Sequence, residues 1–308
     1  MSDFESIDAI GDALKKCSAS LTELRRGRWQ FHLHNGKPMA VSAEVREGWL
    51  RLTTRVRAGD PYGPESFWSL LRLNAELSPF VKLALGSRAA GLHLQADIPV
   101  DPEIGFEGHV RHACIGLETG MRAVHVGVKK SVPIPSSSGP SPVETRLLDL
   151  CREAGWGGRE RSQGSVVVDL ETGGEFYQAT LTESPSAGLH AWVELARCGI
   201  SRSSRAALGV LLLTAGGLVR MARPAVDENL EPASTRFEVR LPPTSGSSEL
   251  DHGLSALSIA CRLCGSEARA LQDEALARQY LAVRGFSRTA DQEQGHPSAR
   301  NQGGPNHG

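Results

Sequence analysis

The sequence predicts an α+β protein built from two tandem copies of one domain. Each copy is expected to order a helix, three strands, a helix, two strands and a helix around an antiparallel sheet. Apolar residues recur at helical and strand spacings in the same order in both halves. Short blocks of similar sequence also recur in the same order, as in an internal repeat. Residues 13–17 resemble 147–151, 80–84 resemble 218–222, 94–99 resemble 237–242, and 113–124 resemble 260–271.

Length and composition fit two domains without a nucleic-acid or membrane partner. The chain has 308 residues, of which 40% are hydrophobic and 22% charged, and its formal net charge is -1. Such a chain can form two cores, and it lacks the basic excess of nucleic-acid-binding proteins. The longest nearly apolar run, residues 206–219, is shorter than a bilayer span of about 20 residues. No signal-peptide pattern opens the chain. We therefore expect a cytoplasmic protein without membrane insertion.

The first copy opens with a predicted helix over residues 6–26, whose apolar residues recur every three or four positions. Arg25, Arg26 and Arg28 are expected to close this helix, because cations complement the dipole at its C-terminus. Asn35-Gly36 predicts a hairpin turn in the strand region that follows. Alternating apolar and polar residues predict three strands there, at residues 29–34, 38–46 and 48–57.

A second helix, over residues 67–77, is expected to end at Ser78-Pro79, because the residue before proline disfavours helical geometry. The matching helix of the second copy spans residues 203–215, and we expect Gly216-Gly217 to end it. Each copy then continues with two strands and a closing helix. These elements are predicted at residues 80–85, 92–99 and 107–125 in the first copy, and at 218–226, 235–241 and 249–274 in the second.

The domain boundaries follow from these elements. The first copy is expected at residues 1–130 and the second at residues 143–286. Between them, residues 131–142 are rich in Ser and Pro and predict a linker. Residues 287–308 carry almost no apolar side chains, so we expect a disordered tail.

Cysteine and histidine side chains are the candidates for metal or thiol chemistry. Cys261 and Cys264 form a C-x-x-C pair on the apolar stripe of a helix, so we expect two packed, reduced thiols. His32 and His34 share a strand face opposite the apolar one, so a solvated face is expected. No phosphate loop, dinucleotide fingerprint or nucleophile elbow occurs. We expect no catalytic residue, metal or cofactor, and a metal- or thiol-dependent sensor or enzyme using these side chains is the alternative.

Residues 206–217 are apolar on nearly every side of the predicted helix, and a single sheet cannot cover them all. The loops and closing helix of the same copy could provide the cover. Alternatively, this helix and residues 67–77 cover each other within one chain as a pseudo-dimer, or each meets a second chain in a homo-oligomer. The residues expected at this contact are Trp68, Leu71, Leu208, Leu211 and Leu212.

Local sequence and element order together resemble a known family. Leu70-Leu-Arg-Leu-Asn74, followed by Gly91-Leu-His-Leu and Ile98-Pro99, is similar to the middle helix and strand pair of the class I type III secretion chaperones and the related YbjN-like proteins. The chain resembles a tandem duplication of that fold. The resemblance implies a non-enzymatic protein that holds extended client segments on apolar patches.

We therefore expect a cytoplasmic, chaperone-like or accessory interaction protein that binds a protein client or partner without catalysis. Trp29, Phe31 and Trp49 are the candidate contacts for a client peptide. Apolar surface of a few hundred Å² would mark such a site. A structural scaffold within a larger complex is a further alternative.

Overall fold

The computed structural model describes residues 3–34, 38–56, 64–86, 91–101, 106–126, 143–162, 164–198 and 201–286. Three predicted features lie outside these residues. They are the Asn35-Gly36 turn, the linker at residues 131–142 and the tail at residues 287–308.

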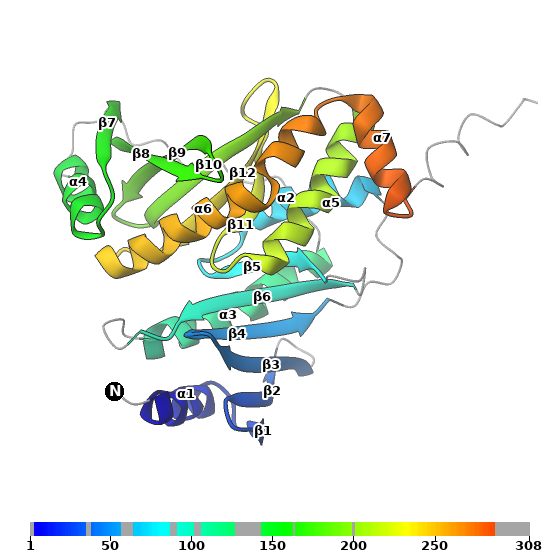
Figure 1. Cartoon of the computed structure of the whole chain (residues 1–308). Helices are drawn as coiled ribbons and strands as arrows, with labels where there is room; N and C mark the ends of the chain where they lie inside the picture. Colours follow the sequence, from blue (N-terminus) through cyan, green and yellow to red (C-terminus); the bar gives the residue numbers. More distant parts are fainter. Residues whose placement is uncertain are drawn as a thin grey trace, which may run out of the picture.

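The first copy forms a six-stranded antiparallel sheet with the strand order β1-β2-β3-β4-β6-β5. The first copy also contains three helices, of which the middle one lies beside the middle helix of the second copy (Figure 1). In chain order the elements are α1 (Asp3–Cys17), β1 (Thr22–Arg25), β2 (Arg28–His34), β3 (Pro38–Arg46), β4 (Trp49–Arg55), α2 (Pro64–Glu76), β5 (Val81–Leu85), β6 (Leu92–Pro99) and α3 (Phe106–Val126).

The second copy repeats this arrangement, since its sheet has the order β7-β8-β9-β10-β12-β11. One more helix follows it. The elements are α4 (Val143–Glu153), β7 (Gly158–Ser162), β8 (Ser165–Thr172), β9 (Glu175–Ser184), β10 (Gly188–Cys198), α5 (Arg202–Leu218), β11 (Arg223–Asp227), β12 (Ala233–Leu241), α6 (Ser247–Ala270) and α7 (Glu274–Val283). The predicted α+β class with antiparallel sheets is confirmed, and the equal strand orders are compatible with two repeated units.

The predicted three-strand pattern is wrong by one strand, because four strands follow the first helix of each copy. In the first copy α1 ends at Cys17, and the stretch expected as its last turns forms β1. The hydroxyl of Ser18 donates to the carbonyl of His32 at 2.8 Å, and the hydroxyl of Ser20 accepts from the amide of His32 at 2.9 Å. These bonds tie the chain to β2 directly after the helix. Periodicity could not reveal β1, because all four of its residues are exposed.

The predicted end of the second copy's middle helix is also wrong. Helix α5 continues through Gly216-Gly217 to Leu218. A Cβ added to Gly216 would lie 2.8 Å from the ring of Pro224, and one added to Gly217 would lie 3.0 Å from the carbonyl oxygen of Leu85. The two glycines therefore allow close packing on neighbouring chain instead of ending the helix.

Each sheet packs one face against the first and third helices of its own copy, α1 and α3 or α4 and α6 (Figure 1). The inward side chains of the strands form the core there. The middle helices behave differently, since α2 contacts α5 and the edge strand β11, while α5 contacts β5. Strands β5 and β11 thus meet where the copies join, and β1 and β7 form the outer edges. Examples of fully or almost fully buried core residues are Phe31, Leu52, Leu94, Val168, Leu181 and Phe237.

Candidate binding surface and thiol pair

Lys82 on β5 and Arg223 on β11 occupy equivalent positions in the two copies. Each lies two residues after a buried residue with left-handed backbone geometry, Phe80 (φ 68°) or Met221 (φ 54°). That residue ends the turn from the middle helix in both copies. The sequence match that paired Phe80 with Leu218 is therefore displaced by 3 residues, because Leu218 still belongs to α5.

Both basic side chains reach across the junction to main-chain carbonyls of the other copy. The Lys82 ammonium lies 2.8 Å from Asp97 and donates to the carbonyl oxygens of Val219 and Ala222, which follow α5. Its side chain is completely buried. Arg223 makes the reciprocal contacts: it pairs with Glu238 at 2.9 Å and donates to the carbonyls of Leu77 and Ser78, which follow α2, at 2.6 and 3.0 Å. The chain after each middle helix is thus held by a cation from the other copy.

Burial and the neighbouring charges shift the pKa values of these four groups. Burial lowers the pKa of Lys82, and Asp97 opposes this shift. Burial lowers the pKa of Arg223 to about 10, so the guanidinium is charged at neutral pH. Burial alone would raise the pKa of Asp97 and Glu238, but their basic neighbours hold both carboxyls below the usual range. Each copy therefore contributes one buried ion pair to the junction.

The middle helices α2 and α5 approach each other closely. A Cβ added to Gly209 of α5 would lie 2.7 Å from the Cβ of Phe67 on α2. The indole of Trp68 donates to Glu228 at 2.9 Å, and the guanidinium of Arg205 lies 5.4 Å from the centre of its ring. The residues predicted for this contact, Trp68, Leu71, Leu208, Leu211 and Leu212, are all buried on these two helices.

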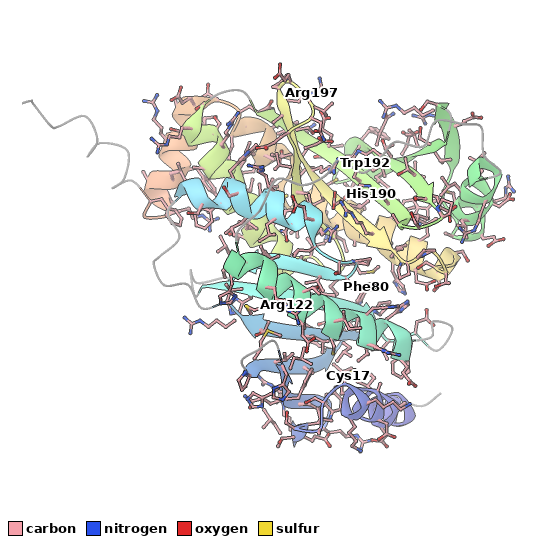
Figure 2. The ribbon with its side chains drawn as sticks, turned by 180° about the vertical axis from the view of Figure 1, so that it is seen from behind. Cys17, Phe80, Arg122, His190, Trp192 and Arg197 are labelled. Carbon is pink, nitrogen blue, oxygen red and sulfur yellow. The ribbon has the colours of Figure 1, made fainter. Side chains whose placement is uncertain are left out.

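The outer face of the second sheet carries a partly exposed aromatic side chain, Trp192 on β10. The ring of His190 lies 4.8 Å from the Trp192 ring, and the guanidinium of Arg236 lies 5.7 Å from its centre. Trp192 faces Thr180 on the next strand, and Thr180 faces Val167. Figure 2 shows His190 and Trp192 from behind, on the face turned away from α6.

The same row in the first copy is polar throughout. The equivalence follows from the sheet registers, since each row can be traced strand by strand from the basic residue at the junction. The two rows are Lys82, Gln95, Thr53, Ser42 and Gln30 in the first copy, and Arg223, Glu238, Trp192, Thr180 and Val167 in the second. Thr53 therefore stands where the second copy has Trp192.

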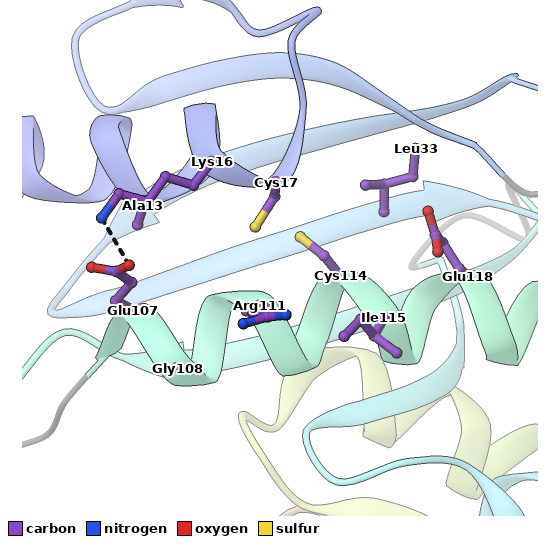
Figure 3. Close-up of a pocket in the computed structure, with 10 residues that line it drawn as sticks. All are labelled: Ala13, Lys16, Cys17, Leu33, Glu107, Gly108, Arg111, Cys114, Ile115 and Glu118. Atoms are coloured by element: carbon purple, nitrogen blue, oxygen red, sulfur yellow. Dashed lines mark hydrogen bonds and ion pairs between the residues drawn. The ribbon is translucent and has the colours of Figure 1, made fainter.

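A hollow of about 530 Å³ lies between α1 and α3, and two thiols face each other in it (Figure 3). Cys17 is the last residue of α1, and Cys114 lies in the middle of α3. An ion pair of 2.8 Å between Lys16 and Glu107 joins the two helices at the rim. The sequence did not single out this pair, because its members are 97 positions apart (114 minus 17). The available signal was that the first and third helices cover the same sheet face.

The three predicted peptide contacts occupy two kinds of site. Trp29 and Phe31 are only 3% and 0% exposed and lie in the core, so neither is available to a client in this structure. Their inward direction follows from the strand alternation that also turns His32 and His34 outward. Trp49 is partly buried at the junction, where it contacts the ring of His252 and the guanidinium of Arg220.

The other predicted pair, Cys261 and Cys264, lies inside the second copy. Both thiols are 1% exposed, and burial raises the pKa of each to about 12. Within the part of the chain that the structure describes, no three Cys, His, Asp or Glu side chains gather as a metal site would require. Among the same residues, no helix has the length and apolarity needed to cross a membrane.

We compared the chain with known proteins. The chain matches no protein-family model, no curated protein and no solved structure.

Proposed function

We propose that the protein is a non-enzymatic interaction protein, and that the outer face of β8, β9 and β10 binds an extended segment of a partner protein around Trp192. The observation that carries this proposal is the partly exposed Trp192, whose row continues into the buried Thr180 and Val167 on a sheet face opposite the helices α4 and α6. The equivalent row of the first copy holds Thr53, Ser42 and Gln30, so the indole is not required by the fold.

The chemistry of Trp192 suits protein recognition. Tryptophan offers a large, rigid contact area with a polar N–H, and it is enriched among residues that dominate binding energy. Charged side chains of both signs lie around Trp192. Arg161 donates to Thr180 at 3.2 Å, and Glu194 pairs with Arg197 at 2.8 Å. An apolar anchor with a polar surround is the usual arrangement of a protein interface.

The junction supports the same proposal. It joins the copies through α2 and α5 into an intrachain pseudo-dimer, so the outer sheet faces need not serve copy-to-copy contact. This arrangement is consistent with the chaperone-like or accessory role in the cytoplasm that the resemblance implies. The client segment would lie on the sheet face, and the buried Trp29 and Phe31 would support the first copy from within.

The test compares Trp192→Thr with the matched control Thr53→Ala at the equivalent place of the first copy. Partners are crosslinked in the native host and identified by mass spectrometry, and a purified partner is titrated calorimetrically. Trp192→Thr should weaken binding by about 30-fold, which corresponds to a loss of about 2 kcal/mol. Thr53→Ala should bind like wild type. Equal affinities for Trp192→Thr and wild type, with circular dichroism unchanged, would refute the proposed surface.

A further inference from the structure

Cys17 and Cys114 form a pair of thiols with unequal access to solvent. Cys17 is partly buried at the end of α1, whereas Cys114 is 4% exposed. Their sulfur atoms point toward each other across the hollow (Figure 3). The rim of the hollow reaches solvent, since the side chains of Lys16 and Glu107 are 64% and 62% exposed. A small molecule can therefore approach Cys17 more easily than Cys114.

Charged and apolar side chains share this hollow. Arg111 and Lys16 provide positive charge near the two sulfurs, while Glu107 and Glu118 provide negative charge. Glu107 pairs with Lys16, and at Cys17 the charge of Arg111 lowers the pKa while that of Glu107 raises it. The apolar part of the lining consists of Ala13, Leu33 and Ile115.

The two thiols differ in acidity for a local reason. Hydrogen bonding from Cys114 lowers the pKa of Cys17 to about 7, and Arg111 adds to this effect against the opposing influence of burial. The same hydrogen bond, together with burial, raises the pKa of Cys114. At neutral pH a substantial fraction of Cys17 is therefore thiolate, which is the nucleophilic form of cysteine. The proton stays on Cys114.

We propose that Cys17 and Cys114 form a redox-responsive site that reacts with peroxide, with Cys17 as the attacking and Cys114 as the resolving thiol. The Cys17 thiolate attacks one peroxide oxygen and breaks the O–O bond. Cys17 becomes a sulfenic acid, and the hydroxide released takes up a proton to form water. The sulfur of Cys114 then attacks the sulfur of Cys17 and loses its proton, and the departing hydroxide forms a second water. Two thiols are oxidised to one disulfide, and one hydrogen peroxide is reduced to two waters.

The disulfide would link the first and third helices over the first sheet, and a dithiol reductant would reverse it by thiol–disulfide exchange. Three cysteines of the second copy whose side chains the structure describes lack these properties. Cys151, Cys261 and Cys264 are at most 1% exposed, and burial raises the pKa of each. Peroxide should therefore select the pair in the first copy over these three thiols.

The experiment treats the full chain with a small excess of hydrogen peroxide under native conditions. Remaining thiols are then alkylated, and unreduced digests are mapped by mass spectrometry. Wild type, which has six cysteines, should lose two free thiols and yield a peptide that joins Cys17 to Cys114. Dithiothreitol should restore both thiols. Retention of all thiols, or a disulfide between another pair, would overturn the proposal.

Three variants assign the roles. Cys17→Ser should consume peroxide more slowly and form no disulfide at Cys114. Cys114→Ser should stop at a sulfenic acid on Cys17, which dimedone traps. The matched control Cys151→Ala, at a buried cysteine on the first helix of the second copy, should behave as wild type. If Cys17→Ser reacts as fast as wild type, Cys17 is not the attacking thiol. Should a variant lose its cooperative melting transition, the peptide map of wild type alone decides.

Discussion

The two copies share a strand order but differ in what their outer sheet faces carry. Across β4, β3 and β2 the first copy carries Thr53, Ser42 and Gln30, whereas the equivalent row of the second copy carries Trp192 and the buried Thr180 and Val167. At the junction the copies remain alike, since Lys82 and Arg223 are both basic and both bind carbonyls of the other copy. The junction has the same chemistry in both copies, whereas the outer faces differ.

The largest expected effect is a loss of stability when a buried ion pair at the junction is broken, and the loss should differ between the two pairs. Glu238→Gln leaves Arg223 buried without its carboxylate, and should lower the free energy of unfolding by about 3–5 kcal/mol. Asp97→Asn should cost less, because Lys82 can release its proton and the arginine cannot. Urea denaturation measures both. Glu194→Gln, on the exposed face of the same sheet, should cost less than about 1 kcal/mol. A loss below 1 kcal/mol for Glu238→Gln would show that the pair does not hold the junction.

The next effect tests the close approach of α2 and α5. Gly209→Ala places a methyl group against Phe67, and overpacking of this kind costs about 1–3 kcal/mol. The control is Gly108→Ala on α3, where an added Cβ meets nothing within 4 Å. That change should stabilise by up to about 1 kcal/mol, through helix propensity alone. Thermal melting compares the two variants. If both raise the melting temperature, the helices are not packed as tightly as the structure has them.

A smaller effect on stability is expected at the outer face, where Trp192 is proposed to serve binding and not folding. Trp192 is only partly buried, so Trp192→Thr should lower the free energy of unfolding by about 1 kcal/mol, less than the removal of a fully buried aromatic. Thr53→Ala should stay within about 0.5 kcal/mol of wild type. Urea titration of the purified variants measures both changes in the free energy of unfolding. A collapse of the fold in Trp192→Thr would make the indole a structural residue and remove the basis of the binding proposal.

The smallest effect is the pH dependence that His190 contributes to stability. Burial lowers the pKa of His190 in the folded protein, against the opposing effect of Glu238 and with that of Arg240 and Arg236. The unfolded chain therefore binds a proton first as the pH falls below about 6.5, and the folded state loses stability in that window. His190→Gln should reduce the difference between urea midpoints measured at about pH 7.5 and 5.5. An unchanged difference would assign the pH dependence to other groups.

Much of the fold could be predicted because its elements have strong periodicity. Strands β2 to β4 alternate apolar and polar residues, and α6 repeats its apolar residues every three or four positions. Strand β1 could not be predicted, since its four residues are exposed and only its pairing with β2 makes it a strand. The end of α5 was missed because Gly216-Gly217 serves close packing, a tertiary cause that has the same local sequence as a helix end.

The candidate sites were harder to predict than the fold. The alternation that identified a strand at Trp29 and Phe31 also placed both side chains in the core, so their aromatic character did not mark a surface. Trp192 stands out only when the registers of the two sheets are compared. Cys17 and Cys114 come together only because α1 and α3 cover the same sheet. These relations depend on the assembled sheets and not on local sequence.

Hydroxyl-radical footprinting of the protein with and without its purified partner tests the proposed binding surface directly. The outer face of the second sheet offers Trp192 and the 73% exposed Phe176 as reactive side chains. We expect the partner to lower the oxidation of both side chains, while the oxidation of Trp49 at the junction changes little. If Trp192 and Phe176 stay as reactive in the complex as in the free protein, the partner binds elsewhere and the claim fails.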